Sequence, residues 1–352
     1  MPAIHDEPEK VKVVHQYGLG VHCGELYPDY LNPSWQQKQF LDYVDFAIEA
    51  EALGFDGLTL TEHHVPHISN PSPHILLANV AAKTTRIRLG TAVTVLPFYQ
   101  PVRAVEEAAM LDLLSNGRFE LGLGRGSPRE FAHATGGTPE EGQERFSEGC
   151  DLVEIALRNE TFTFNGKYTK ISEPFVVTPL PIQRQLPVWV AAQSAATIAL
   201  AAKKGWNLLR NFGDNAEHRI ALEHYMNVAR EHGRELSGAN FMISRFVCIA
   251  HDEEVAKQNA ERLIEIFSAD FPRRRDAEPT GFKPPWPPLV CGTPDQVLKE
   301  LQKTLRETGA RRLMVEAISM EETQLFAREV LPALRHTCLD EDVLGTSRLE
   351  NA

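Results

Sequence analysis

Two adjacent histidines, His63 and His64, follow a glutamate at the end of a short apolar run. Histidine titrates near neutral pH, so it can accept or release a proton, and a buried neighbour such as Glu62 could orient it. Successive side chains of an extended chain point to opposite sides, so only one of the two imidazoles can readily face a common site. This stretch is therefore a candidate for acid–base chemistry.

A third histidine, His67, lies close enough in sequence to suggest a metal site. Such a site needs further histidine or carboxylate ligands from other strand ends, and no strand end supplies an obvious set. We therefore predict no metal. The five cysteines are scattered and never spaced as CxxC, which argues against a disulfide framework or a structural zinc site.

A glycine-rich run, residues 122–126, places Arg125 between two glycines. It superficially resembles a dinucleotide-binding fingerprint, but the third glycine and the following helix start are missing. We interpret the run as a strand end whose small residues let a flat ligand approach the backbone. Arg125 would present its guanidinium to an anion, with a surface salt bridge as the alternative.

Ser194 and Thr197 stand where a strand pattern passes directly into a helix pattern. Free backbone N–H groups and the positive end of the helix dipole make such a start attractive to phosphate. A serine or threonine at a helix start is more often a plain N-cap. The arginine on a nearby strand end favours the phosphate interpretation.

The elements that would position these residues alternate between strand and helix at about 30 residues per unit, which is typical of βαβ units on a parallel sheet. We expect eight strands, at residues 13–21, 57–61, 87–95, 119–123, 187–192, 206–209, 241–250 and 312–316. We expect helices at residues 37–53, 101–114, 195–203 and 216–231, and a further one that begins at residue 72 or 73 and ends at residue 83.

This pattern predicts an α/β fold, a (β/α)8 TIM barrel in which the C-terminal strand ends share one rim. Glu62, His63, Thr91 and Arg125 could meet at that rim although they are far apart in sequence. An open doubly wound sheet is the alternative, but no glycine-rich turn follows the first strand to support it.

Two segments do not fit the regular alternation of strands and helices in a barrel. We expect them to be inserted loops at the C-terminal rim. Residues 131–181 contain a helix and a hairpin pattern, with strands at 162–164 and 167–169 around Asn165-Gly166. Residues 270–290 are rich in proline, which excludes a regular helix or a central strand. We expect one domain over residues 1–352, with polar tails at 1–10 and 337–352.

Composition restricts the class of protein. Acidic residues outnumber basic ones by 48 to 36, giving a formal net charge of −12 that repels nucleic acid and anionic lipid. No apolar run is long enough to cross a membrane, and the N-terminus does not resemble a signal peptide. We expect a cytoplasmic protein without a nucleic acid or membrane partner.

Taken together, these segments resemble the bacterial luciferase-like, flavin-dependent monooxygenases over about residues 18–334. The order and spacing of the segments carry the resemblance. They are Thr61-Glu62-His63-His64, Asn70-Pro71, Leu89-Gly90-Thr91, Pro101-Val102-Arg103, the run from Leu111 to Phe119, residues 122–126 and Ala191-Ala192-Gln193-Ser194.

The resemblance implies FMN bound at the C-terminal mouth of a barrel. Family members take reduced FMN from a separate NAD(P)H:flavin reductase, react it with oxygen and insert one oxygen atom into a small organic substrate. His63 matches the family's catalytic histidine, with Glu62 beside it. The residues expected at the cofactor are Thr91, Ala92, Val93, Arg125, Gln193, Ser194 and Thr197.

Several details of the resemblance bear on the site. Arg125, Ser194 and Thr197 match the groups that hold the FMN phosphate, and Ala92–Val93 falls where the family often has a non-prolyl cis peptide under the flavin ring. Gln193 stands where luciferase has a glutamate. Gly124 stands where luciferase has a reactive cysteine, so no role of that thiol is expected here. Family members commonly pair through helices near the second and third units, so we expect a homodimer.

Two other functions stay open. One is a deazaflavin-dependent hydride-transfer oxidoreductase from the sister branch of the superfamily. The other is a non-catalytic flavin-binding subunit. The substrate cannot be inferred from the sequence, and light emission is not implied.

Overall fold

The computed structural model describes residues 10–17, 31–64, 70–158, 160–275, 289–337 and 339, with only the backbone for residues 266–275. In this part of the chain, eight parallel strands form a closed ring. They are β1 (Lys12–Tyr17), β2 (Gly57–Leu60), β3 (Arg88–Thr91), β5 (Phe119–Gly124), β8 (Val188–Ala191), β9 (Asn207–Arg210), β10 (Phe241–Ile249) and β12 (Arg312–Ala317). The ring closes because β10 pairs with both β9 and β12, and β12 pairs with β1. The predicted TIM barrel is confirmed.

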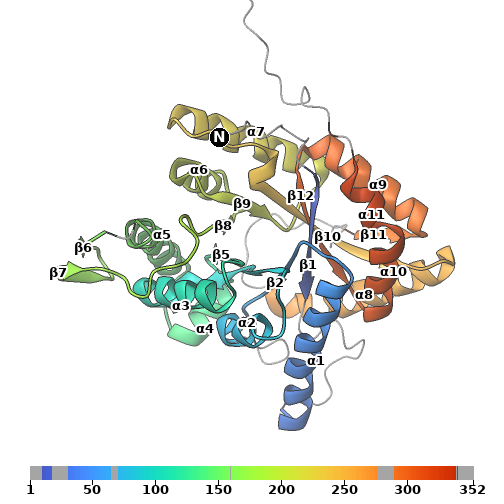
Figure 1. The fold of residues 1–352 in the computed structure, drawn as a ribbon, viewed down its shortest axis with the longest axis horizontal. Coiled ribbons are helices and arrows are strands. Elements are labelled where there is room, and N and C mark those ends of the chain that lie inside the picture. Colours follow the sequence, from blue (N-terminus) through green and yellow to red (C-terminus); the bar gives the residue numbers. More distant parts are fainter. Residues whose placement is uncertain are drawn as a thin grey trace, which may run out of the picture.

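Helices surround the ring, as Figure 1 shows. They are α1 (Pro33–Ala52), α2 (Pro73–Ala81), α3 (Pro101–Leu114), α4 (Pro128–Thr135), α5 (Pro139–Ala156), α6 (Ala195–Lys204), α7 (Asn215–Glu231), α8 (Glu253–Arg275), α9 (Pro294–Thr308), α10 (Met320–Glu329) and α11 (Leu331–Arg335). Short 3-10 turns occur at η1 (Leu96–Phe98) and η2 (Gly238–Asn240). Many helices begin with proline in their first turn, where its missing N–H costs no hydrogen bond.

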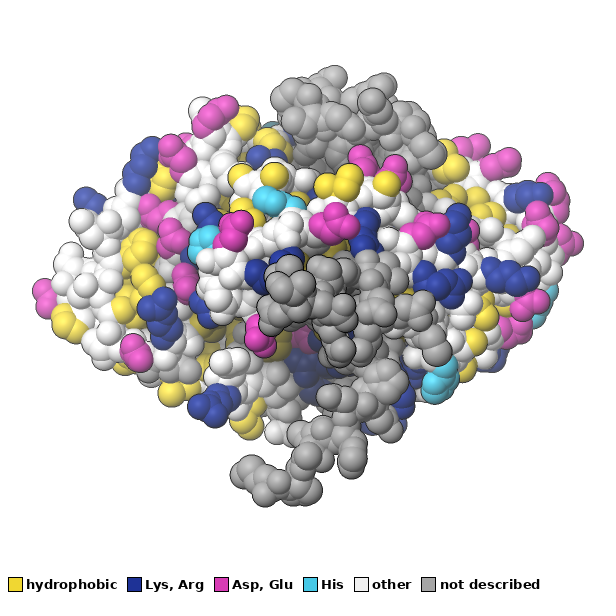
Figure 2. Space-filling model, turned by 90° about the horizontal axis from the view of Figure 1, so that it is seen from above, with side chains coloured by type: hydrophobic (Ala, Val, Ile, Leu, Met, Phe, Trp, Pro, Cys, Tyr) yellow, Lys and Arg dark blue, Asp and Glu magenta, His cyan; other side chains and the backbone are white. Residues whose placement is uncertain are grey.

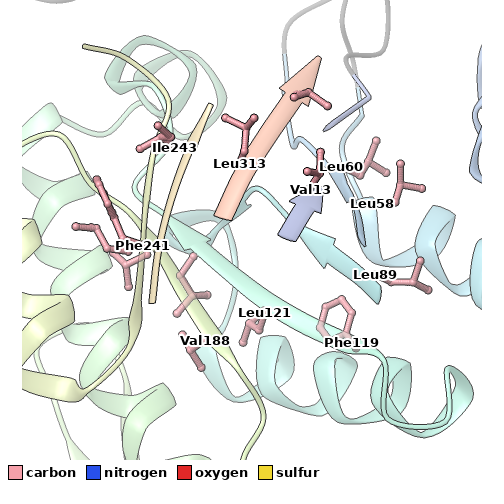
Figure 3. Packing of buried hydrophobic residues seen from close by; sticks show 14 of the residues in the cluster. Val13, Leu58, Leu60, Leu89, Phe119, Leu121, Val188, Phe241, Ile243 and Leu313 are labelled. Atoms are coloured by element: carbon pink, nitrogen blue, oxygen red, sulfur yellow. The ribbon is translucent and has the colours of Figure 1, made fainter. Parts of the chain in front are cut away.

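The main hydrophobic core lies between the outer face of the barrel and the helices. Alternate residues of each strand point outward, and Figure 3 shows such side chains, including Val13, Leu58, Leu89, Leu121 and Leu313, on neighbouring strands. The opposite residues fill the barrel itself. This alternation places the polar residues at the strand ends on the inside or on the rim.

The predicted element boundaries differ from the observed ones in instructive places. The strand expected at 87–95 is interrupted after Thr91 and resumes as β4 (Thr94–Val95), which pairs with β5. Residues 18–21 of the first predicted strand lie outside the described residues. An additional strand, β11 (Leu289–Gly292), pairs with the C-terminal half of β10 outside the ring, and the sequence pattern did not reveal it.

The two expected insertions are partly corrected. The first contains α4, α5 and a hairpin of β6 (Phe162–Asn165) and β7 (Lys170–Phe175), so the predicted second strand at 167–169 is its turn. Glu148 on α5 accepts hydrogen bonds from the backbone N–H groups of that turn, and the hairpin lies beyond α5, away from the barrel (Figure 1). Within this insertion, Glu130 on α4 and Gln143 on α5 contact residues of the rim, His63 and Arg125 respectively.

In the second insertion, α8 continues to Arg275, so its first residues are helical against our expectation. Pro272 lacks the N–H that would donate to the carbonyl of residue 268, and the helix ends three residues later. Residues 276–288 lie outside the described residues.

Acidic and basic side chains are interspersed over the face shown in Figure 2, and the chain carries a formal net charge of −12. A polyanion would therefore meet carboxylates as well as cations on this face. Among the described helices, none has both the length and the apolar character that crossing a bilayer requires.

Glycines let the segment from β3 to β4 pack closely against β5. A Cβ atom on Gly122 would lie 1.9 Å from the carbonyl oxygen of Thr91, and one on Gly124 would lie 2.3 Å from a methyl group of Val93. Gly126 has a φ of +73° and would place a Cβ 2.4 Å from a methyl group of Val95. The glycines thus serve contact between strands, which corrects our interpretation that they leave room for a flat ligand.

The close approach at Gly122 yields a stability prediction. Gly122→Ala should destabilise the fold by on the order of 3 kcal/mol, because the methyl group meets backbone that cannot rotate away. Gly57→Ala is the control, since its Cβ would lie 3.3 Å from the side chain of Val14, which can adjust. Equal unfolding midpoints in urea for the two variants would contradict this account.

Candidate active site

The candidate site lies at the C-terminal ends of β2, β3 and β5, where the chain presents His63. The backbone of His63 forms a two-way bridge with Asn70, which fixes its path beyond β2. Its Nδ1 lies 3.3 Å from a carboxylate oxygen of Glu130 on α4, and 28% of its side chain is exposed. His63 therefore combines access to solvent or ligand with a carboxylate that orients the ring.

Glu62 does not orient His63, contrary to our expectation. Its buried carboxylate contacts Nε2 of His64 at 3.0 Å and accepts hydrogen bonds from the backbone N–H of Val95 and the hydroxyl of Tyr99, both at 3.1 Å. Residues 62 and 64 share one side of an extended chain, whereas His63 points to the other. Glu130 is the carboxylate that sequence reasoning missed.

The two histidines consequently have different surroundings. The ring of His64 lies 4.4 Å from that of Phe98, and the hydrogen bond with Glu62 raises the pKa of His64. Glu130 also accepts a hydrogen bond from the backbone N–H of His64 at 2.9 Å. One carboxylate thus fixes both the ring of His63 and the backbone that follows it.

Thr91, predicted at the cofactor, joins β3 to β5. Its hydroxyl donates to the carbonyl of Gly122 and accepts from the N–H of the same residue, both at 2.9 Å. Thr94 donates to Thr91 at 3.0 Å and also contacts the buried ring of His74. His74 in turn contacts Glu107 on α3 at 3.0 Å, and this hydrogen bond lowers the pKa of Glu107 to about 2. Thr91 is therefore saturated by protein contacts.

The next two residues, Ala92 and Val93, are joined by a non-prolyl cis peptide bond, at the position where the resemblance placed one. Ala92 is buried in a small cluster inside the barrel with Trp189, Leu209 and Met314, and Val93 packs against it while partly exposed. Both residues therefore face the interior of the barrel near its mouth.

Arg125 directly follows β5 and is half-buried. Its closest polar contact is with the amide oxygen of Gln143 at 3.5 Å, and it forms no ion pair with any carboxylate in the described chain. A guanidinium that pairs with no carboxylate can bind an anion by donating two parallel N–H hydrogen bonds to it. The surface salt bridge that we considered as an alternative is not formed with any carboxylate of the described residues.

Ser194 and Thr197 begin α6, which follows β8, the neighbour of β5. Ser194 is the N-cap of the helix and accepts from the N–H of Thr197 at 3.3 Å, and the two hydroxyl oxygens lie 3.0 Å apart. Gln193 and Ser194 are exposed. Both the N-cap role and an accessible helix start are present, so the two interpretations are compatible.

A second arginine, Arg210, was missed by the sequence analysis. It ends β9, is 7% exposed, and donates from one terminal nitrogen to the carbonyls of Ala192 and Gln193, both at 3.2 Å. Burial lowers its pKa. Arg210 therefore fixes the backbone directly before Ser194. Its position at the end of an otherwise apolar strand was the available signal.

No cluster of three or more histidine, cysteine, aspartate or glutamate side chains suited to a metal occurs in the described residues. His67, Cys23 and Cys338 lie outside them. Burial raises the pKa values of the Cys150 and Cys248 thiols, so neither resembles an activated nucleophile.

Comparison with known proteins adds an independent line of argument. Residues 28–312 match the family model described as luciferase-like monooxygenase. An uncharacterised protein of Sinorhizobium fredii is 34% identical over 235 residues, which is 66% of this chain and 65% of the relative. The alkanal monooxygenase alpha chain of the Kryptophanaron alfredi symbiont is 28% identical over 66% of each chain. The chain thus matches about two thirds of the length of these relatives. The oxygenase component of the flavin-dependent trigonelline monooxygenase of Acinetobacter baylyi is 29% identical, over 68% of this chain and 69% of that protein.

Solved structures agree on the fold. The monooxygenase RslO1 from Streptomyces bottropensis superposes with a TM-score of 0.76 at 24% identity, covering 92% of this chain and 99% of that one. The oxygenating constituent of 3,6-diketocamphane monooxygenase from Pseudomonas putida, solved with FMN, gives 0.74 at 18% identity, covering 92% and 98%. An F420-dependent secondary alcohol dehydrogenase gives 0.75 at 17% identity, covering 93% and 99%.

Proposed function

The chain belongs to the luciferase-like monooxygenase family, and we propose that it is an FMN-dependent monooxygenase that inserts one oxygen atom into a small organic substrate. Reduced FMN, when bound, supplies the two electrons that this reaction needs, and the second oxygen atom of O2 leaves as water. The observation that carries the proposal is the position of Arg125. It has no carboxylate partner in the described residues and lies beside the start of α6, on the same rim as the accessible His63.

The residues present fit the phosphate end of FMN. Arg125 has no carboxylate partner in the described chain, and the hydroxyls of Ser194 and Thr197 stand at the accessible start of α6. The pairing of β5 with β8 brings the ends of these two strands side by side. Arg125 would bind the phosphate in its fork, and the first turn of α6 would add N–H groups and hydroxyls.

His63 would hold and move the proton of the reaction. Its Nδ1 faces Glu130, so the outer nitrogen, Nε2, is the one that can meet a ligand. Glu130 would keep the ring oriented and stabilise its protonated form. Ala92 and Val93, which face the barrel interior, would provide an apolar surface that excludes water from the flat ring.

We further propose that a separate NAD(P)H:flavin reductase supplies the reduced FMN. Support comes from the trigonelline relative, whose name describes an oxygenase component.

A deazaflavin-dependent oxidoreductase is the second candidate function, favoured by the F420-dependent enzyme among the structures with this fold. Titration of the protein with FMN and with F420, followed by oxygen-uptake measurements, separates the two. Binding of FMN with oxygen consumption driven by reduced FMN supports the monooxygenase. Binding of F420 alone, without oxygen consumption, contradicts it. A non-catalytic subunit would bind FMN and form no product in any screen of aldehydes, ketones, sulfonates and terpenes.

We propose a homodimer formed through α2 and α3. These adjacent helices expose large apolar side chains, including Ile75, 75% exposed, and Met110 and Leu114, one helical turn apart and 51% and 61% exposed. Exposed apolar residues that gather on neighbouring helices suit a protein interface. Light scattering that gives the mass of a single chain would contradict this proposal.

The role of His63 leads to a kinetic prediction. His63→Ala should bind FMN like the parent protein but lose turnover about 10²- to 10⁴-fold, the usual contribution of a positioned acid or base. Glu130→Gln is the matched variant, because it keeps an acceptor for the ring and removes the charge, so its loss should be smaller. Product formation by His63→Ala at the parental rate would show that the proton passes elsewhere.

The phosphate site leads to a binding prediction. Arg125→Ala should weaken FMN binding about tenfold to a hundredfold, the value of a charge-assisted hydrogen bond, and leave the binding of riboflavin unchanged. Arg129→Ala, which removes an exposed arginine of α4, is the control. Equal losses for FMN and riboflavin would place the phosphate away from Arg125.

A further inference from the structure

The interior of the barrel changes character toward its C-terminal mouth. Inside the ring lies an apolar cluster that includes Val14, Leu209, Met242 and Met314. Side chains two residues further along the same strands point to the same side, because successive residues of a strand alternate. Those residues are Gln16 on β1, Asn211 directly after β9, Ser244 on β10 and Glu316 on β12. A polar layer therefore lies on the mouth side of the apolar one.

Three polar side chains of this layer have groups without a hydrogen-bond partner among the described residues. Glu316 is 3% exposed, and its carboxyl has no hydrogen-bond partner among the described residues. Gln16 is 7% exposed, and its Oε1 is buried without a partner in the same part of the chain, as is Oδ1 of Asn211. Buried polar atoms are normally satisfied, so three unsatisfied groups in one layer indicate a place where a ligand completes the bonding.

The opposite end of the barrel interior provides a contrast. There the carboxylate of Glu120 accepts from the indole N–H of Trp189 at 2.6 Å and forms ion pairs with Arg88 and Arg312. Polar residues inside this barrel are thus satisfied where the interior serves stability. The unsatisfied ones occur at the end that carries His63 and Arg125.

The charge state of Glu316 follows from its surroundings. Burial raises the pKa of Glu316 to about 8, so the group is largely protonated at neutral pH. The neighbouring strands present the uncharged Gln16, Ser244 and Phe246, and Arg312 on the same strand is engaged with Glu120. On the helix side, the carboxylate of Glu322 is occupied by the backbone N–H groups of Ile249 and Ile318. No cation of the described chain stabilises an ionised Glu316.

We propose that Gln16, Asn211 and Glu316 form the specificity-determining end of the substrate site, which accepts an uncharged hydrogen-bonding group and rejects charged ones. This inference rests on the proposed function. A protonated carboxyl donates to a hydroxyl, carbonyl or amide oxygen of the ligand, and the two amides complete the contacts. A carboxylate, sulfonate or ammonium group would be buried over an apolar layer, at a desolvation cost that neutral partners do not offset.

The first experiment tests the charge state without any ligand. Because the folded pKa of Glu316 exceeds the unfolded value, the folded protein binds the extra proton, and stability should fall as pH rises from about 5 through 8. The unfolding midpoint of the parent should therefore decrease relative to that of Glu316→Gln over this range. If the unfolding midpoints of the two proteins change with pH in parallel, Glu316 is not protonated at neutral pH in the folded protein. Glu322→Gln is a second comparison: burial raises the pKa of Glu322 to about 7, so this variant should remove a separate part of the fall in stability, at lower pH than Glu316→Gln does.

The second experiment tests selectivity on the FMN-loaded protein with four probes of one carbon skeleton: cyclohexanol, cyclohexanone, cyclohexanecarboxylate and cyclohexylamine. Isothermal titration should show that the two neutral probes bind at least tenfold more tightly than the charged ones. Binding of cyclohexanol to the parent should weaken as pH rises past 8, whereas Glu316→Gln should bind it independently of pH. Glu316→Ala should bind it at least tenfold more weakly, and Glu322→Gln like the parent.

Three results would overturn the inference. Tightest binding of the amine would identify an ammonium site. Loss of FMN affinity in Glu316→Ala with unchanged probe binding would assign the layer to the flavin ring. Failure of both neutral probes to bind would exclude the selectivity. A parent protein that binds no FMN would contradict the proposed function instead, and the same titrations on the free protein would still decide the selectivity.

Discussion

The rim of the barrel depends on the buried carboxylate of Glu62. A charged group removed from water is tolerated only when donors surround it, and Glu62 gathers three, from Val95, Tyr99 and His64. His64 lies beyond the end of β2, Val95 ends β4, and Tyr99 directly follows η1. One carboxylate therefore fixes the relative positions of the segments that form the mouth. Because His63 directly follows Glu62, the backbone of His63 is fixed as well. The imidazole ring of His63 is oriented by Glu130.

The close contact between β3 and β5 is the second condition for the mouth. Thr91 exchanges hydrogen bonds with Gly122, and the glycines of β5 admit Thr91, Val93 and Val95 at distances that no side chain would allow. The hydrogen bonds set the register, and the missing Cβ atoms set the spacing. As a result Ala92 and Val93 enter the barrel interior, and Arg125 leaves the strand at the rim. A motif that superficially suggests phosphate binding thus acts mainly through backbone packing.

The sequence allowed the barrel and much of its rim to be predicted, for physical reasons that can be stated. Apolar runs at regular spacing encode buried parallel strands, and Pro101 with Ser115-Asn116-Gly117 marked both ends of α3 correctly. The partners of the histidines were predicted less well. Alternation along a strand already indicated that Glu62 and His64 share a side, but Glu130 is 67 residues from His63 and no local pattern connects them. Arg210 escaped for the same reason, since its carbonyl partners belong to another strand. The strand β11 was concealed by the prolines that precede it.

Buried polar groups without hydrogen-bond partners in the described residues indicate the proposed functional end of this barrel more directly than its sequence motifs do. The TIM fold alone makes both ends of the interior equivalent as places to bury side chains, and at the N-terminal end the chain closes a complete network around Glu120. The amide oxygens of Gln16 and Asn211 and the carboxyl of Glu316 have no partner among the described residues, and each such group costs roughly 1–3 kcal/mol of stability. A sequence selected for stability alone would replace them with apolar residues of similar size, as it has done one layer below. On our proposal, a ligand that enters the barrel completes the hydrogen bonds of these groups, and the His63 rim and the Glu316 layer form two sides of one site.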